Sequence, residues 1–127
     1  MINILLVDDS TMARQRIKEI IKQSSIDYTI NEAENGVEAL KILQNTKINC
    51  VITDLEMPQM GGIELTEKIR KIHASTAIII ISSLANEQVK QKLRQDRLAD
   101  FIKKPINAKQ LVNILLKVQH NLKEDLS

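Results

Sequence analysis

Four short apolar runs in this chain each end in residues that can bind ions or donate hydrogen bonds. The runs and the residues that follow them are Ile4–Val7 with Asp8 and Asp9, Cys50–Thr53 with Asp54, Ile78–Ile81 with Ser82 and Ser83, and Phe101–Lys103 with Lys104 and Pro105. In a parallel sheet the carboxyl ends of the strands lie along one edge, where open α/β sheets hold their sites. The pattern therefore predicts that three carboxylates, a hydroxyl and an ammonium group meet at one edge of such a sheet.

Segments with helical periodicity alternate with the apolar runs. The first, about residues 10–23, has apolar residues at helical spacing from Ala13 to Ile21, and its charged residues, Arg14 among them, are expected on a solvated face. The segment Tyr28–Ala33 alternates in polarity as an edge strand does. Such alternation of strands and helices is typical of repeated βαβ units. We therefore predict an α/β fold with five strands and five helices in one doubly wound, mainly parallel sheet.

The composition suits one soluble globular domain. The 127 residues correspond to a single domain, predicted at residues 1–122, with a polar tail at 123–127. The net charge of +2 is too small to indicate binding to nucleic acid or to an anionic membrane, and no apolar run is long enough to span a membrane. The single cysteine, Cys50, is predicted to be a core residue. A lone cysteine cannot form an internal disulfide, and the amino terminus lacks the charged flank of a signal peptide. Both features favour the cytoplasm.

Three carboxylates at one place repel one another unless a cation lies between them. Mg²⁺ resolves this repulsion, because it prefers oxygen ligands and binds one or two carboxylates while it keeps several waters; Mn²⁺ is a substitute. An aspartate beside such an ion is a competent nucleophile toward a phosphoryl group. The metal, Lys104 and Ser82 would neutralise or bind the phosphoryl oxygens from three sides. The residue set therefore predicts phosphoryl transfer to an aspartate.

Each of these residues taken alone also has an ordinary structural role. Asp8 and Asp9 can cap a helix, and Asp54 can be a loop carboxylate. Ser82 can likewise be a helix cap, and the segment at Lys104 can end a helix. The occurrence of all of them at successive strand ends is what favours a common site.

Five segments form a highly specific set of motifs. They are Leu6–Ser10, Glu34–Leu40, Thr53–Pro58, Ser82–Ser83 and Lys103–Pro105. Together they resemble the receiver domain of two-component response regulators, over a stretch from Ile4 to about Val118. The resemblance implies a flavodoxin-like sheet with the strand order 2-1-3-4-5. It also implies a signalling protein that is not an enzyme with an external substrate and that catalyses only its own phosphorylation and dephosphorylation.

The resemblance implies a role for each residue near the acidic edge. Asp54 would accept the phosphoryl group. Mg²⁺ would be held by Asp9, Asp54 and the backbone carbonyl of Glu56, with Asp8 assisting through water. Lys104 would contact the phosphoryl group.

The resemblance also implies how the phosphorylated state is transmitted. The hydroxyl of Ser82 would move toward the phosphoryl group, and the aromatic ring of Phe101 would turn into the space that it leaves. Glu56, two residues beyond Asp54, is predicted to tune the lifetime of the phosphorylated state, as is Leu84. The surface that changes would be made by the fourth helix, the fifth strand and the fifth helix.

Two segments depart from the family pattern. Gly61-Gly62 stands where Asp-Gly is usual, which removes a side chain that would cap the next helix. Arg97-Leu98 stands where Gly-Ala is common, just before the fifth strand. Neither departure removes a catalytic group.

The implied phosphodonor is a histidine kinase or a phosphotransfer protein. The output partner is a downstream protein, or a second copy of the chain, bound at the surface of the fourth helix, fifth strand and fifth helix. The densest basic cluster, Lys90, Lys92, Arg94 and Arg97, is either a solvated face or a docking site, and the partner is expected to meet Lys90, Lys92 and Arg94. We expect a stand-alone, chemotaxis-regulator-like protein. The alternative is a receiver domain from a longer DNA-binding or enzyme-linked response regulator.

Other protein classes share parts of this pattern. An FMN-binding electron carrier of flavodoxin type needs a phosphate loop rich in Ser, Thr and Gly after the first strand and aromatic rings around the flavin. This chain has two acids there, no Trp, one Tyr and one Phe. A phosphatase of haloacid-dehalogenase type needs Asp-x-Asp at the same position, whereas this chain has Asp8-Asp9-Ser10. A pseudo-receiver that only binds proteins is inconsistent with Asp54 and Lys104.

Overall fold

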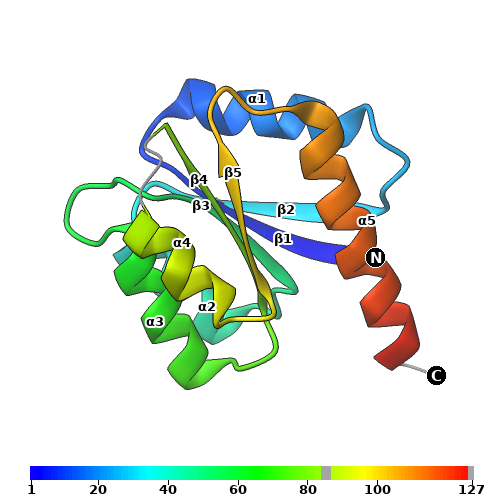
Figure 1. Cartoon of the computed structure of the whole chain (residues 1–127). Coiled ribbons are helices and arrows are strands. Elements are labelled where there is room, and N and C mark those ends of the chain that lie inside the picture. Colours follow the sequence, from blue (N-terminus) through cyan, green and yellow to red (C-terminus); the bar gives the residue numbers. More distant parts are fainter. Residues whose placement is uncertain (84–86, 126–127) are drawn as a thin grey trace.

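The computed structural model describes residues 1–83 and 87–125. Within these residues, five parallel strands form one sheet in the order β2-β1-β3-β4-β5 (Figure 1). The strands are β1 (Ile2–Val7), β2 (Tyr28–Ala33), β3 (Cys50–Asp54), β4 (Ala77–Ser82) and β5 (Ala99–Lys103). The predicted α/β class and strand order are therefore confirmed. Leu84, predicted to tune the phosphorylated state, lies outside the described residues.

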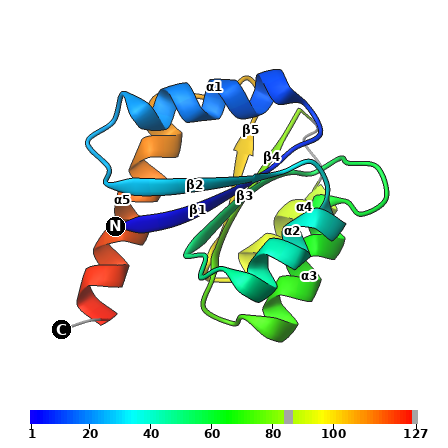
Figure 2. The same ribbon diagram turned by 180° about the vertical axis from the view of Figure 1, so that it is seen from behind.

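Five helices in the described part of the chain cover the two faces of the sheet. They are α1 (Thr11–Lys22), α2 (Gly36–Asn45), α3 (Gly62–Ile72), α4 (Glu87–Arg94) and α5 (Ala108–Asp125). Helices α1 and α5 lie against one face, and α2, α3 and α4 lie against the other (Figures 1 and 2). Helix α5 continues to Asp125, past the boundary predicted at residue 122. None of the described helices is long and apolar enough to cross a membrane.

The central strands are apolar along their whole length because both of their faces are covered. On β1 and β3, Ile4 and Ile52 pack in the layer under α1 and α5, whereas Leu5 and Val51 pack under α2 and α3. Cys50 is fully buried in the first layer, as predicted. Burial raises the pKa of its thiol to about 12, so this cysteine stays protonated near neutral pH.

Helix α1 departs from the predicted pattern at one position. Arg14 is only 8% exposed, so its placement on the solvated face was wrong. It precedes Ile17 and Ile21 by three and seven residues, which puts it on the same buried face of the helix. An ion pair between Arg14 Nε and Glu32 Oε1, at 2.9 Å, compensates its charge. The periodicity of α1 does not reveal this partner, because Glu32 lies on a different element, strand β2.

Helix α3 begins directly against the end of β3. Its N-cap residue is Gly61, which makes no side-chain capping hydrogen bond, as the Gly61-Gly62 pair predicted. A Cβ atom on Gly62 would lie 2.6 Å from the carbonyl oxygen of Asp54 and 3.1 Å from the Cα atom of Leu55. Both are backbone atoms that cannot rotate away, so this close approach of α3 to the acidic edge requires glycine at position 62.

Gly62→Ala is therefore expected to lower the free energy of unfolding by about 1–3 kcal/mol, because the added methyl group overlaps the backbone after β3. Gly61→Ala is the matched control, since its added carbon would lie 3.1 Å from the Leu55 carbonyl oxygen and should cost less. Urea unfolding followed by circular dichroism measures both changes. Equal losses in the two variants would show that α3 shifts to accommodate the methyl group.

Candidate functional site

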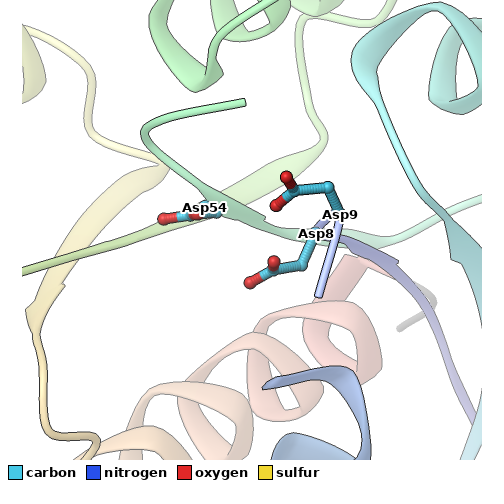
Figure 3. Close-up of side chains that lie close together, drawn as sticks. All are labelled: Asp8, Asp9 and Asp54. Carbon is cyan, nitrogen blue, oxygen red and sulfur yellow. The ribbon is translucent and has the colours of Figure 1, made fainter. Parts of the chain in front are cut away.

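Three aspartates from two adjacent strands meet at the carboxyl edge of the sheet (Figure 3). Asp8 and Asp9 follow β1, and Asp54 ends β3; one carboxylate oxygen of each lies within 4.8 Å of the others. Val7 pairs with Thr53 in the parallel register, so the next residues of both strands leave the sheet side by side. Asp8 is buried, Asp54 is half-buried and Asp9 is exposed. The convergence of carboxylates predicted from the sequence is thus observed.

The cap of helix α1 does not use these carboxylates. Ser10 is its N-cap, and Ser10 Oγ accepts a hydrogen bond from the backbone N–H of Ala13 at 3.1 Å. Asp8 Oδ1 accepts instead from the backbone N–H of Ser10 at 2.9 Å, which closes the turn between β1 and α1. The capping role that the sequence left open for the acid pair therefore belongs to Ser10.

The surroundings of Asp8 disfavour a charged carboxylate. Burial is the largest influence and raises the pKa of Asp8 above its ordinary value of 3.8. The hydrogen bond from the Ser10 amide lowers this pKa, the negative charge of Asp54 raises it, the ammonium of Lys104 lowers it, and the charge of Asp9 raises it. The net rise reports repulsion and desolvation that a cation at this place would relieve.

Lys104 and Ser82 lie at the same edge. Lys104 Nζ is 3.5 Å from Asp54 Oδ1. The backbone N–H of Lys104 donates to the carbonyl oxygen of Ser82 at 2.8 Å, which joins the ends of β5 and β4. On the other side of β4, the Leu55 N–H donates to the Ile81 carbonyl oxygen at 3.0 Å. Ser82 is buried and stands between the strand ends that hold Asp54 and Lys104.

The donor set fits a small divalent cation that prefers oxygen. The three carboxylates can each offer an oxygen to a common point, and such hard ligands suit Mg²⁺. Because Asp9 is exposed, one side of the cluster is open to the waters that Mg²⁺ retains. The repulsion among the acids disappears when a cation lies between them, so the chemistry of the site favours metal binding.

A family model described as the response regulator receiver domain matches residues 4–116. The chain belongs to this receiver-domain family. It is 33% identical over 117 residues to the chemotaxis protein CheY of Listeria monocytogenes, an alignment that covers 92% of this chain and 98% of that protein. It is 32% identical over 128 residues to the transcriptional regulatory protein HptR of Staphylococcus aureus, but spans 50% of that protein's length.

Solved structures of receiver domains share the fold. The chemotaxis response regulator CheY4 of Vibrio cholerae superimposes with a TM-score of 0.79 at 28% identity, over 93% of this chain and 98% of that one. A CheY-like receiver domain protein of Methanospirillum hungatei gives a TM-score of 0.84 at 27% identity, over 98% of both chains. These matches confirm the predicted family and the flavodoxin-like arrangement.

Two predicted residues of this receiver domain lie at the margin of the site or beyond it. Glu56 is exposed in the loop after β3. The ring of Phe101 is half-buried on β5, and Lys90 Nζ of α4 lies 5.9 Å from its centroid. This ring lines a hollow of about 390 Å³ between α4, β5 and α5, which we call the basic groove. The residues lining the basic groove are Lys90, Arg94, Ala99, Asp100, Phe101, Lys103 and Gln110.

The predicted basic cluster is divided between different surroundings. Lys90 and Arg94 line the basic groove of the receiver. Lys92 Nζ lies 3.2 Å from Glu67 Oε1 of α3, and the two side chains form an exposed ion pair. Arg97 lines a different hollow, at the turn before β5. Two of the four residues therefore face the groove beside Phe101.

One residue beside the acidic site was not anticipated. Arg14 Nη1 donates to the backbone carbonyl oxygen of Asp8 at 2.5 Å. The available signal was its spacing from Ile17 and Ile21, which places it on the buried face of α1. A buried guanidinium needs acceptors, so this spacing predicts hydrogen-bond acceptors close to Arg14. Its contact with the Asp8 carbonyl could not be predicted, because every residue has a backbone carbonyl and the sequence pattern reports only side chains.

Asp8→Asn is expected to raise the melting temperature of the metal-free receiver at about pH 7, because it removes a charge that burial and the other acids disfavour. The folded protein holds the Asp8 proton more tightly than the unfolded chain does. Stability therefore falls as the pH rises from 3.8 to the raised pKa, and above that pKa the penalty is complete. Calorimetry in EDTA measures the melting temperature of each variant.

The matched control is Glu19→Gln, which neutralises an exposed carboxylate on α1 and should leave the melting temperature nearly unchanged. The gain from Asp8→Asn should shrink as the pH falls from the raised pKa to 3.8 and be absent below 3.8, where the wild-type carboxyl is protonated in both states. A gain of the same size at all pH values would contradict the electrostatic explanation.

Proposed function

We propose that this receiver domain is a phosphorylation-activated signalling switch. In this proposal, Asp54 accepts a phosphoryl group from a histidine kinase or a phosphotransfer protein in a reaction that depends on Mg²⁺. The observation that carries the proposal is Lys104 Nζ at 3.5 Å from an Asp54 oxygen, with the carboxylates of Asp8 and Asp9 gathered at the same site. Membership in the receiver family supports it.

Asp54 would supply the nucleophile for this transfer. One of its carboxylate oxygens attacks the phosphorus, and the P–N bond to the donor histidine breaks as the O–P bond forms. The imidazole leaves with the electron pair of the broken bond. Mg²⁺, held by Asp9, Asp54 and the Glu56 backbone carbonyl with Asp8 acting through water, would neutralise charge on the phosphoryl oxygens. Lys104 adds a second positive charge from the side of β5.

We further propose that phosphorylation is transmitted to α4, β5 and α5. The Ser82 hydroxyl moves to the phosphoryl group and vacates space for the ring of Phe101. When this ring turns inward it leaves its place beside Lys90, so the shape and charge of the basic groove change. Because Lys90, Arg94 and Lys103 line that groove, the partner is a protein with an acidic segment or a second copy of the chain.

Glu56 is proposed to tune the lifetime of the phosphorylated state, a role also proposed for Leu84. The exposed Glu56 carboxylate follows Asp54 by two residues, so its negative charge lies close to the added phosphoryl group. It either disfavours that added charge or orients the attacking water.

The similarity to known regulators supports two forms of output. The match over 98% of the Listeria chemotaxis protein supports a regulator that acts through contact with another protein. The alternative is a receiver linked to a DNA-binding or enzymatic domain, and the match to half of the length of HptR favours it. In both forms the receiver would act through the same surface.

Incubation of the wild-type protein with acetyl phosphate and Mg²⁺ is expected to add one phosphoryl group, which intact-mass spectrometry detects. Asp54→Asn should remain unmodified, because an amide is not a competent nucleophile here. Asp9→Asn should react more slowly, since it removes a proposed metal ligand. Asp27→Asn, an exposed change at the opposite edge of the sheet, is the control and should react like the wild type. Undiminished phosphorylation of Asp54→Asn would place the acceptor elsewhere.

Beryllofluoride bound at Asp54 is expected to shift amide resonances at Phe101 and along 87–94, in addition to those near the acidic site. Ser82→Ala should shrink the distant shifts, because the hydroxyl that links the two regions is gone. Ser83→Ala removes a neighbouring exposed hydroxyl and should preserve them. Nuclear magnetic resonance of the three proteins makes the comparison. Distant shifts that survive in Ser82→Ala would show that the signal takes another route.

A further inference from the structure

Arg14 connects the acidic turn to two other parts of the fold. Its Nη1 donates to the carbonyl oxygen of Asp8 at 2.5 Å, and its Nε donates to Glu32 Oε1 at 2.9 Å. Its Nη2 lies 3.4 Å from Thr11 Oγ1. Lys18 Nζ donates to the second oxygen of Glu32 at 3.0 Å. One buried side chain of α1 thus links the end of β1 with strand β2.

Hydrogen bonds hold Asp8 at its amide, its carbonyl and its carboxylate. Its N–H donates to the Ala33 carbonyl oxygen at 3.1 Å, its carbonyl accepts from Arg14, and its Oδ1 accepts from the Ser10 N–H at 2.9 Å. The carbonyl belongs to the planar peptide group that joins Asp8 to Asp9. The bond from Arg14 therefore sets the orientation of this plane, and with it the direction in which the Asp9 side chain leaves the backbone.

We propose that Arg14 is the positioning residue of the acidic site, which holds the peptide group between Asp8 and Asp9 so that their carboxylates reach Asp54. The inference rests on the proposed function, in which these carboxylates bind Mg²⁺. The role depends on the planar fork of the guanidinium, which reaches a carbonyl and a carboxylate at once, whereas a lysine ammonium is a single point charge. Loss of such a supporting residue typically weakens metal binding by about 10- to 100-fold.

Arg70 makes the same kind of connection at the opposite edge of the sheet. Its Nε donates to Asp96 Oδ2 at 2.6 Å, and its Nη1 donates to the carbonyl oxygen of Thr76 at 2.5 Å. Thr76 precedes β4, so this connection lies at the amino ends of the strands, away from the aspartates. Removal of either arginine breaks one bond to a carboxylate and one to a backbone carbonyl, but removal of Arg70 leaves the acidic turn intact. This makes Arg70→Leu a matched structural control.

Titration calorimetry with Mg²⁺ on the whole chain compares the wild type with Arg14→Lys, Arg14→Leu and Arg70→Leu. Both Arg14 variants are expected to raise the dissociation constant of Mg²⁺ by about tenfold or more. Arg14→Lys keeps the positive charge and loses the fork, so a loss in this variant reports geometry rather than charge. Arg70→Leu should lower the melting temperature and leave the dissociation constant unchanged.

A second measurement follows the acidic turn without metal. The Ser10 amide is protected by its bond to Asp8 Oδ1, so its hydrogen exchange reports whether the turn is held. In EDTA, exchange at Ser10 should be faster in both Arg14 variants than in the wild type. It should be unchanged in Arg70→Leu. Faster exchange in all variants alike would indicate general destabilisation and overturn the inference.

The outcomes separate this inference from the proposed function. If the wild type binds no Mg²⁺, the proposed metal chemistry is wrong and the positioning role is overturned with it. If the wild type binds Mg²⁺ and the Arg14 variants bind it equally well, the positioning role of Arg14 alone is overturned. Weaker binding in Arg14→Lys, with slower exchange at Ser10 in the wild type, supports the inference.

Discussion

The parallel sheet holds three carboxylates closer together than like charges prefer. Two charges about 4 Å apart repel by about 4 kcal/mol near a protein surface. Against this, each large apolar side chain that β1 and β3 bury contributes about 1.5–3 kcal/mol. Ile4, Leu5, Leu6, Val51 and Ile52 are all buried almost completely. The apolar strands therefore keep the acids within 4.8 Å of one another in the metal-free protein, with the repulsion present as strain on the site.

That repulsion determines what the site accepts. Three carboxylates and the ammonium of Lys104 leave two negative charges, which one divalent cation balances. The proposed phosphoryl group would carry about two negative charges at neutral pH and would replace the single charge of the Asp54 carboxylate, so phosphorylation would add about one negative charge to the site. Donors near the edge, Lys104 and Ser82, would be drawn to this new charge. In the proposed switch, the attraction between the phosphoryl oxygens and the Ser82 hydroxyl is therefore what moves the serine.

The sequence predicted the elements that depend on apolar periodicity and on strand ends. The gathering of Asp8, Asp9 and Asp54 and the burial of Cys50 follow from local patterns, whereas the strand order was implied by the resemblance to the receiver family. Arg14 was misplaced because its partners are a carbonyl oxygen after β1 and a carboxylate on β2. Contacts between a side chain and a distant backbone group have no period in the sequence. The path of the turn after β1 likewise determines that Ser10, and not Asp8 or Asp9, caps helix α1.

The two ends of the proposed switch differ in how firmly they are held. At the acidic turn, Asp8 is fixed by three hydrogen bonds, one of them from a charged and buried arginine. At the basic groove, the ring of Phe101 is held in part by a cation–π contact with Lys90, worth about 0.5–1 kcal/mol at an exposed site. Hydrogen bonds to charged groups are worth about 1.5–3 kcal/mol each. The Phe101 ring also packs against the core layer under α2 and α3. Strand β5 carries Phe101 and ends directly before Lys104, so it joins the two ends of the proposed switch within a few residues.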